Sequence, residues 1–105
     1  MTTDQSPYGL SADVIAKIHA VFGNFASIEK AILYGSRAKG TYRNGSDIDL
    51  TLIGKNLTHT QLLSIELALD ELMLPYKFDL SLHHQLDSPE LLDHIRRVGI
   101  EFYRR

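Results

Sequence analysis

The chain has 105 residues and a mass of 11.9 kDa, the size of one small domain, so we expect a single domain over residues 1–105. Eleven Lys and Arg against 13 Asp and Glu give a net charge of −2, so no overall basic field recruits nucleic acid. The absence of cysteine excludes a disulfide scaffold, a thiolate metal site and a cysteine nucleophile.

The N-terminal residues show no sign of a targeting segment. Residues 1–9 are short and polar, and we expect a flexible tail there. No apolar run approaches the roughly 18 residues that span a bilayer, and no secretory apolar region precedes a cleavage site. These observations predict a cytoplasmic protein that does not interact with a membrane.

The first half of the chain predicts a helix followed by two strands. Ser11 can cap a helix with apolar residues at helical spacing, and Gly23 can stop it. Residues 30–34 are typical of a short buried strand. Residues 37–45 are basic and interrupted by glycine, which leaves room for a helical turn or two. Residues 47–53 alternate strictly between polar and apolar, which predicts a half-buried strand.

The second half continues the same alternation of helices and strands. Thr58 or Thr60 can cap a helix that Pro75 stops, and residues 76–82 form another alternating strand. Ser88, followed by proline, starts a last helix that ends at Gly99. A final strand follows directly, and the two arginines after it favour an edge position.

These elements predict a small α/β (α+β) fold in which helices pack on a mixed β-sheet. Because the alternating strands have a polar side, one face of that sheet should be at least partly open. The carboxylates of the chain lie on this side.

The first feature that could bind a ligand is the Gly35-Ser36 pair after the first predicted strand. A glycine backbone followed by a hydroxyl at a helix start can offer N–H groups and an Oγ to a phosphate. Arg37 and Lys39 lie where the helix dipole disfavours cations, and a bound polyphosphate would reverse that preference. The pair is equally typical of a plain strand-to-helix turn, so both interpretations stay open here.

Two carboxylates share one side of the following strand. Asp47 and Asp49 stand at i and i+2, about 6.6–6.8 Å apart along a strand, so both can lean onto a hard cation such as Mg²⁺. Like charges repel and strands disfavour aspartate, so a positive partner is expected. A solvated pair at a strand start is the alternative. An EF-hand loop fails, because its glycine and glutamate positions fall on Asp49 and Lys55.

Asp79 lies inside the next alternating strand, on the polar side like Asp47 and Asp49. Three aspartates on one sheet face, beside a turn suited to phosphate, describe a two-metal phosphoryl-transfer site. Metals about 3.5–4 Å apart would stabilise the attacking and leaving oxygens together.

This combination resembles the signature of the DNA polymerase beta-type nucleotidyltransferases. The signature reads Gly-Ser-x-Ala-x-Gly, five residues, then Ser-Asp-x-Asp-Leu, and residues 35–50 fill every fixed position. Asp79, within Phe78-Asp79-Leu80, matches the third carboxylate of the family. The spacing is most similar to that of the minimal nucleotidyltransferases (MNT), and the resemblance spans residues 10–103.

The resemblance implies the polymerase beta-like fold and a reaction in which a nucleoside triphosphate donates its nucleotidyl group to an acceptor hydroxyl and releases pyrophosphate. It implies that Asp47 and Asp49 bind two Mg²⁺ ions. Asp79 would ligate the catalytic ion and help to deprotonate the acceptor. The expected donor is ATP or another nucleoside triphosphate.

The resemblance also implies which residues hold the nucleotide. Gly35 and Ser36 would bind the triphosphate, with Ser46 as the further serine of the signature. Arg37 and Lys39 would act as charge partners for the phosphates.

A partner is implied as well. Larger relatives carry a second domain that grips the acceptor, so we expect a separate helical subunit or a homo-oligomer to supply that surface here. Minimal members resemble one half of a module whose other half is an all-helical HEPN protein. The MNT protein often acts there as antitoxin, and the HEPN protein is an RNase toxin that can itself receive AMP. We therefore expect AMP transfer from ATP by the antitoxin half of a HEPN/MNT pair.

Two other functions stay open at this point. The chain could neutralise a HEPN-type partner by occlusion without catalysis, or it could sense nucleotide or metal without transfer. The acceptor, whether protein tyrosine, RNA end or small molecule, is not fixed by the sequence.

Several patches have weaker interpretations. Residues 56–76 carry acidic residues and no Lys or Arg, and are either a docking face for a basic partner or a solvated helix face. His83 and His84 point to opposite sides of a strand and cannot chelate together. A C-terminal cluster could touch RNA or an acidic partner, or simply be solvated: Arg96, Arg97, Arg104 and Arg105. The scattered histidines suggest no function: His19, His59 and His94.

Overall fold

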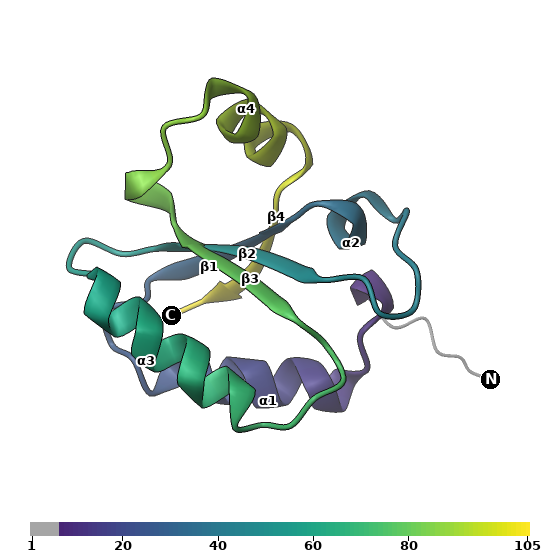
Figure 1. Ribbon diagram of the computed structural model, residues 1–105, viewed down its shortest axis with the longest axis horizontal. Helices are drawn as coiled ribbons and strands as arrows, with labels where there is room; N and C mark the ends of the chain where they lie inside the picture. The colour runs from purple at the N-terminus through teal and green to yellow at the C-terminus, as the bar shows by residue number, and fades with distance from the viewer. Residues whose placement is uncertain (1–6) are drawn as a thin grey trace.

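The computed structural model describes residues 7–105, within which four strands form one mixed sheet in the order β3-β2-β1-β4 (Figure 1). β1 (Lys30–Tyr34) runs antiparallel to both β2 (Ile48–Ile53) and β4 (Ile100–Arg104). β3 (Phe78–Leu82) runs parallel to β2 and forms one edge of the sheet. β4 forms the other edge, which confirms the position predicted for the last strand.

Helices cover the two sides of the sheet unequally (Figure 1). α1 (Ala12–Gly23) and α3 (His59–Asp70) lie together on one side, whereas α4 (Pro89–Val98) lies on the opposite side and packs on β1. The single-turn α2 (Ser36–Lys39) follows β1 directly. The mixed α/β class predicted from the sequence is confirmed. Two short 3₁₀ turns complete the description: η1 (Pro7–Gly9) and η2 (His83–Gln85).

Side-chain hydroxyls start the three longer helices. The Oγ atoms of Ser11 and Ser88 accept backbone N–H groups at the starts of α1 and α4, as predicted. Thr58, rather than Thr60, caps α3, and the Gln61 side chain completes a reciprocal capping box with it.

The core lies between the sheet and the pair α1 and α3. The apolar residues of the alternating strand β2, Ile48, Leu50 and Leu52, are fully buried there. Alternation then sends the intervening residues of β2 and β3 to the side of α4. The hydrophobic pattern therefore decides which sheet face carries the carboxylates.

Several boundaries differ from the prediction. β2 begins at Ile48 rather than at residue 47, and β3 begins at Phe78 rather than at residue 76. Residues 7–9, which the sequence places in a flexible tail, form the turn η1, and the Tyr8 carbonyl accepts a 2.9 Å hydrogen bond from Arg37. Residues 1–6 of the expected tail lie outside the described residues.

The end of α3 also differs. The helix stops at Asp70, because the chain leaves it through a turn with Met73 in the left-handed region (φ 57°), well before Pro75. Among residues 7–105, no helix combines the length and apolar character that crossing a membrane requires.

Candidate functional site

The polar side chains of three adjacent strands form a row on the sheet face that α4 partly covers. The strand register places Tyr34 of β1 opposite Asp49 of β2, and Asp49 opposite Asp79 of β3. Since neighbouring strands lie about 4.8 Å apart, the two carboxylates are direct neighbours. Two residues further along the same face, Ser81 Oγ donates a 2.9 Å hydrogen bond to Oγ1 of the fully buried Thr51. The open part of the polar face therefore carries the aspartates Asp49 and Asp79, which we call, together with Asp47, the aspartate row.

Asp47 completes an acidic cluster with Asp49 and Asp79, because it lies one residue before β2 and is exposed like Asp79. Burial, and after it the negative charges of Asp79 and Asp47, together raise the pKa of Asp49 from 3.8 to about 6, against the opposing charge of Arg37. Burial, together with the charges of Asp79 and Asp49, also raises the pKa of the Tyr34 hydroxyl, although a hydrogen bond with Ser81 opposes the shift. Negative charge at this site is thus poorly compensated by the protein alone.

Gly35 makes room for the Asp49 carboxylate. Its φ of 77° lies in the left-handed region, which favours glycine. A Cβ added at this position would overlap Asp49 Oδ2. Glycine is therefore needed here both for the turn and for the close approach of the carboxylate. Ser36 follows as the first residue of α2 and is half-buried.

His94 of α4 reaches the same turn. The Gly35 N–H donates to His94 Nε2 over 3.1 Å, and the imidazole packs edge-on against Tyr34, with ring centroids 6.1 Å apart. The sequence suggested no function for His94. The one signal that could have identified it is a polar residue on the apolar stripe of α4 formed by Leu91 and Val98, and only the fold shows what it faces.

Arg37 is buried, with 3 % of its surface exposed, and its guanidinium binds backbone carbonyls. Nε and Nη2 donate to the Ser46 carbonyl over 3.1 and 2.9 Å, and Nη1 donates to that of Tyr8. The rings of Tyr42 and Tyr76 flank its Cζ at 5.4 and 5.0 Å. Arg37 therefore anchors the loop before β2, and this geometry gives no support to the expected triphosphate contact.

The other two expected nucleotide ligands lie on either side of that loop. Lys39 is exposed at the end of α2. Ser46 Oγ accepts the Arg43 N–H over 2.8 Å and so shapes the turn that delivers Asp47 to the strand. Its hydroxyl has a structural partner already.

The donor set suits a hard cation. Within residues 7–105, no three His, Cys, Asp or Glu side chains converge closely enough to enclose a metal ion. Mg²⁺, however, is usually held by one or two carboxylates together with waters and substrate phosphates. The oxygen ligands of Asp47, Asp49 and Asp79 and the raised pKa of Asp49 fit such an ion. His83 and His84, which the sequence places on a strand, lie instead in the turn η2. His84 is not one of these ligands, since its Nε2 donates to the Leu57 carbonyl.

The fold is shared with chains of solved toxin–antitoxin complexes. One, from a toxin–antitoxin structure with AMP-PNP, has a TM-score of 0.68 at 21% identity, with 91% of this chain and 75% of that chain covered. Another, from the tri-AMPylated Shewanella oneidensis HEPN toxin in complex with MNT antitoxin, has a TM-score of 0.63 at 17% identity, covering 88% and 71%. A chain of the MntA–HepT structure gives the same TM-score, identity and coverage. At these identities the likeness shows the fold.

The family follows from the sequence profile. No curated protein matches the chain at a significant level. The profile of the family described as "Polymerase beta, Nucleotidyltransferase" matches residues 16–105, which is most of the chain and includes all three aspartates. The chain therefore belongs to the polymerase beta nucleotidyltransferase family.

Proposed function

We propose that the chain transfers AMP from ATP to a hydroxyl of a partner protein, with Mg²⁺ at the aspartate row, as the antitoxin of a toxin–antitoxin pair. The observation that carries the proposal is the register that sets Asp49 beside Asp79, with Asp47 next to them. Their mutual repulsion contributes to raising the Asp49 pKa to about 6, which a bound divalent cation would relieve. A chain that uses ATP and Mg²⁺ is expected to work in the cytoplasm.

Each residue has a defined task in this reaction. Asp47 and Asp49 would hold two Mg²⁺ ions, and Asp79 would also bind the catalytic one. When bound, Mg²⁺ supplies positive charge that stabilises the attacking and leaving oxygens. Asp79, exposed on the edge strand, is placed to accept the proton of the acceptor hydroxyl. The acceptor oxygen then bonds to the α-phosphorus, the bond from that phosphorus to the β-phosphate oxygen breaks, and pyrophosphate leaves.

The triphosphate would lie along the turn between β1 and α2. Because His94 already accepts the Gly35 N–H, we assign the phosphate contact to the Ser36 hydroxyl. Gly35 contributes the close backbone approach. Lys39 is exposed nearby and would contribute charge, whereas Arg37 acts by holding the loop.

The donor and acceptor are inferred from the structural neighbours. One of those structures contains AMP-PNP, and another contains an AMPylated HEPN toxin bound to an MNT antitoxin. Each of these two structures contains a chain with the same fold as this one. They favour ATP as donor and a helical partner protein as acceptor.

The test uses ATP labelled at the α-phosphate, Mg²⁺ and a purified HEPN-type partner encoded beside this chain. Label should move to the partner with release of pyrophosphate, and ATP labelled at the γ-phosphate should transfer none. Asp49→Asn and Asp79→Asn should each lower the rate about a hundredfold or more. Asp87→Asn, in the exposed loop before α4, is the matched control and should keep the full rate.

Absence of transfer despite saturable nucleotide binding would overturn the proposal. In that case the non-catalytic alternative predicts that Asp47→Asn combined with Asp49→Asn still neutralises the partner in cells.

A further inference from the structure

α3 carries apolar residues on two sides. Leu62, Ile65 and Leu69 face the core and are almost fully buried. Leu63 and Leu67, one turn apart, are 54% and 62% exposed. A surface helix of a globular protein ordinarily has one apolar stripe, which packs on its own core. The second stripe of α3 is therefore surface that its own fold does not cover.

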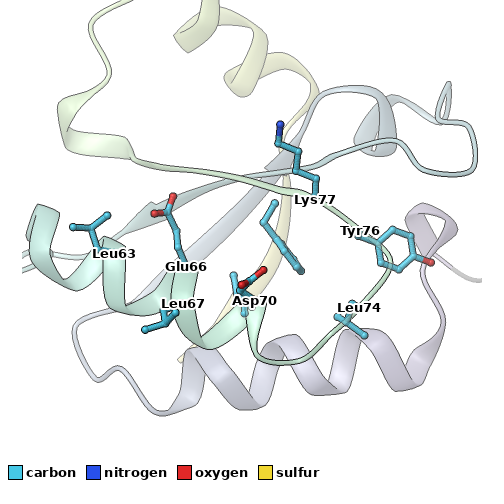
Figure 2. A pocket seen from close by; sticks show the side chains of 9 residues that line it. Leu63, Glu66, Leu67, Asp70, Leu74, Tyr76 and Lys77 are labelled. Carbon is cyan, nitrogen blue, oxygen red and sulfur yellow. The ribbon is translucent and has the colours of Figure 1, made fainter.

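A groove lies beside this second stripe, between α3 and the edge strand β3 (Figure 2). Its volume is about 390 Å³, and Leu74, Tyr76 and Phe78 contribute to its apolar lining together with Leu67 and Leu69. The stripe and the groove form one continuous apolar surface. Exposed patches of this kind mark sites where another molecule binds.

The rim of the groove is acidic. Glu66 and Asp70 of α3 line it, and Figure 2 shows their carboxylates pointing across it toward β3, while Lys77 extends away from α3. Residues 56–76 contain a further acidic residue, Glu71, and no Lys or Arg. An apolar surface with an acidic rim is complementary to an apolar surface with a basic rim.

A second copy of this chain does not meet that requirement. Symmetric pairing through α3 would bring Glu66 and Asp70 against their own copies, and like charges repel. The basic residues of α4, Arg96 and Arg97, already pair with Asp93 on the same helix over 2.6 and 2.8 Å. If Arg96 and Arg97 of one copy contacted α3 of another copy, the contact would be head-to-tail. Such contacts produce open chains of copies unless they close into a ring.

We propose that the α3–β3 groove binds a helix of a different protein, one that presents an apolar stripe flanked by Lys and Arg. The stripe would pack against Leu63 and Leu67, and its cations would face Glu66 and Asp70. Phe78 lines the groove, whereas its neighbour Asp79 lies on the opposite side of β3. A partner bound there is held at the strand that carries Asp79, without occupying the aspartate row.

The test uses two synthetic helical peptides of about 20 residues. Both carry leucines at i, i+3, i+4 and i+7, and the flanking positions are Lys and Arg in one peptide and Glu in the other. Fluorescence anisotropy measures their affinities for the full chain, and chemical-shift changes map the bound surface. The basic peptide should bind about tenfold more tightly or better than the acidic one, with shifts confined to α3, β3 and the loop that joins them.

Variants then separate the groove from the rest of the surface. Leu63→Ser with Leu67→Ser should weaken binding of the basic peptide about tenfold. Glu66→Lys with Asp70→Lys should reverse the preference between the two peptides. Met73→Ser is the matched apolar control, because Met73 is 86% exposed and does not line the groove, so its binding should be unchanged.

Asp79→Asn should bind the peptide like the unaltered chain, which separates docking from nucleotidyl transfer. Lack of saturable binding, equal binding by the groove variants, or shifts that lie mainly outside residues 59–82 would each overturn the proposal. Self-association that Leu67→Ser abolishes would assign the groove to a second copy and would overturn it as well.

Discussion

At the scale of single residues, Gly35 combines a left-handed backbone with contact to a carboxylate that the proposed reaction needs. Gly35→Ala should lower transfer strongly, because the new Cβ displaces the Asp49 carboxylate. It should also cost about 1–2 kcal/mol of stability through the strained φ of 77°. Gly45→Ala is the matched control: its φ is 84°, but a Cβ there meets nothing within 4 Å.

The Gly45→Ala variant should show a similar loss in urea denaturation while it keeps its transfer rate. Equal loss of activity in the two variants would mean that backbone strain, rather than the position of Asp49, decides the rate.

Asp49 predicts how stability depends on pH. Its pKa rises from 3.8 to about 6 in the folded chain, so between these values the folded state binds more protons than the unfolded state. Stability therefore falls as pH rises through this window and levels off above it. Asp49→Asn removes the charge and should stabilise the chain at pH 7.5 by roughly 1 kcal/mol, allowing for solvent screening, with little effect at pH 4.

Urea denaturation in EDTA at the two pH values measures this difference. Mg²⁺ at pH 7.5 should reduce it, because the ion stabilises the charged aspartate. A variant that is less stable than the unaltered chain at both pH values would contradict the origin assigned to the raised pKa.

At the scale of elements, the alternation of polar and apolar residues along a strand could be read from the sequence, but the pairing of one strand with another could not. Residues 47–53 predicted both a strand and the side that carries Asp49, because a period of two sets the faces directly. The pairing of Asp49 with Asp79 depends on β3 lying parallel to β2, which no local pattern specifies. The choice of Thr58 over Thr60, in contrast, is readable from the sequence, because Gln61 stands three residues after Thr58 and completes a capping box, whereas Leu63 stands three residues after Thr60.

Arg37, which holds the loop between α2 and β2, is a second case in which the sequence did not reveal the contacts of a residue. Arg37 follows the signature serine, and its charge favoured a phosphate contact; its burial against two carbonyls became visible only in the fold. Arg37→Met should therefore lower the free energy of unfolding by about 3 kcal/mol, since it leaves those carbonyls without a donor. Lys39→Met, on the exposed end of α2, should change it by about 0.5 kcal/mol or less.

Kinetics complete the comparison: Lys39→Met should raise the KM for ATP if its charge assists the triphosphate. The assignment of Arg37 to the loop fails if Arg37→Met keeps full stability and changes only KM.

α4 is linked to the site through His94, which accepts the Gly35 N–H and packs against Tyr34. His94→Ala removes the acceptor of the Gly35 N–H, so amide exchange at Gly35, followed by NMR, should speed up. We expect the KM for ATP to rise more than kcat falls, because the turn is positioned less well while the aspartates remain. His59→Ala, at the exposed first residue of α3, is the control. Unchanged exchange at Gly35 would show that His94 does not hold the turn.

At the scale of the whole molecule, the sheet divides the chain into a structural side and a chemical side. The side of α1 and α3 contains the core, and the side of α4 contains the aspartate row. The C-terminal strand is fastened to the structural side, because Arg105 donates to the carbonyls of Ile28 and Phe25. A substitution in the aspartate row can therefore change chemistry while the core stays intact.

This separation gives a prediction for ligand binding by the whole chain. A ligand that binds only the folded state stabilises it by about 2.7 kcal/mol at a hundred times its Kd. For a chain of this size, Mg²⁺ with AMP-PNP should then raise Tm by about 10 °C in a thermal scan. EDTA should remove most of the shift, because without the cation the phosphates meet Asp47 and Asp49 directly. Asp47→Asn with Asp49→Asn should lose the shift, and Gly45→Ala should retain it. A shift that is equally large in EDTA would mean that the nucleotide binds away from the aspartate row.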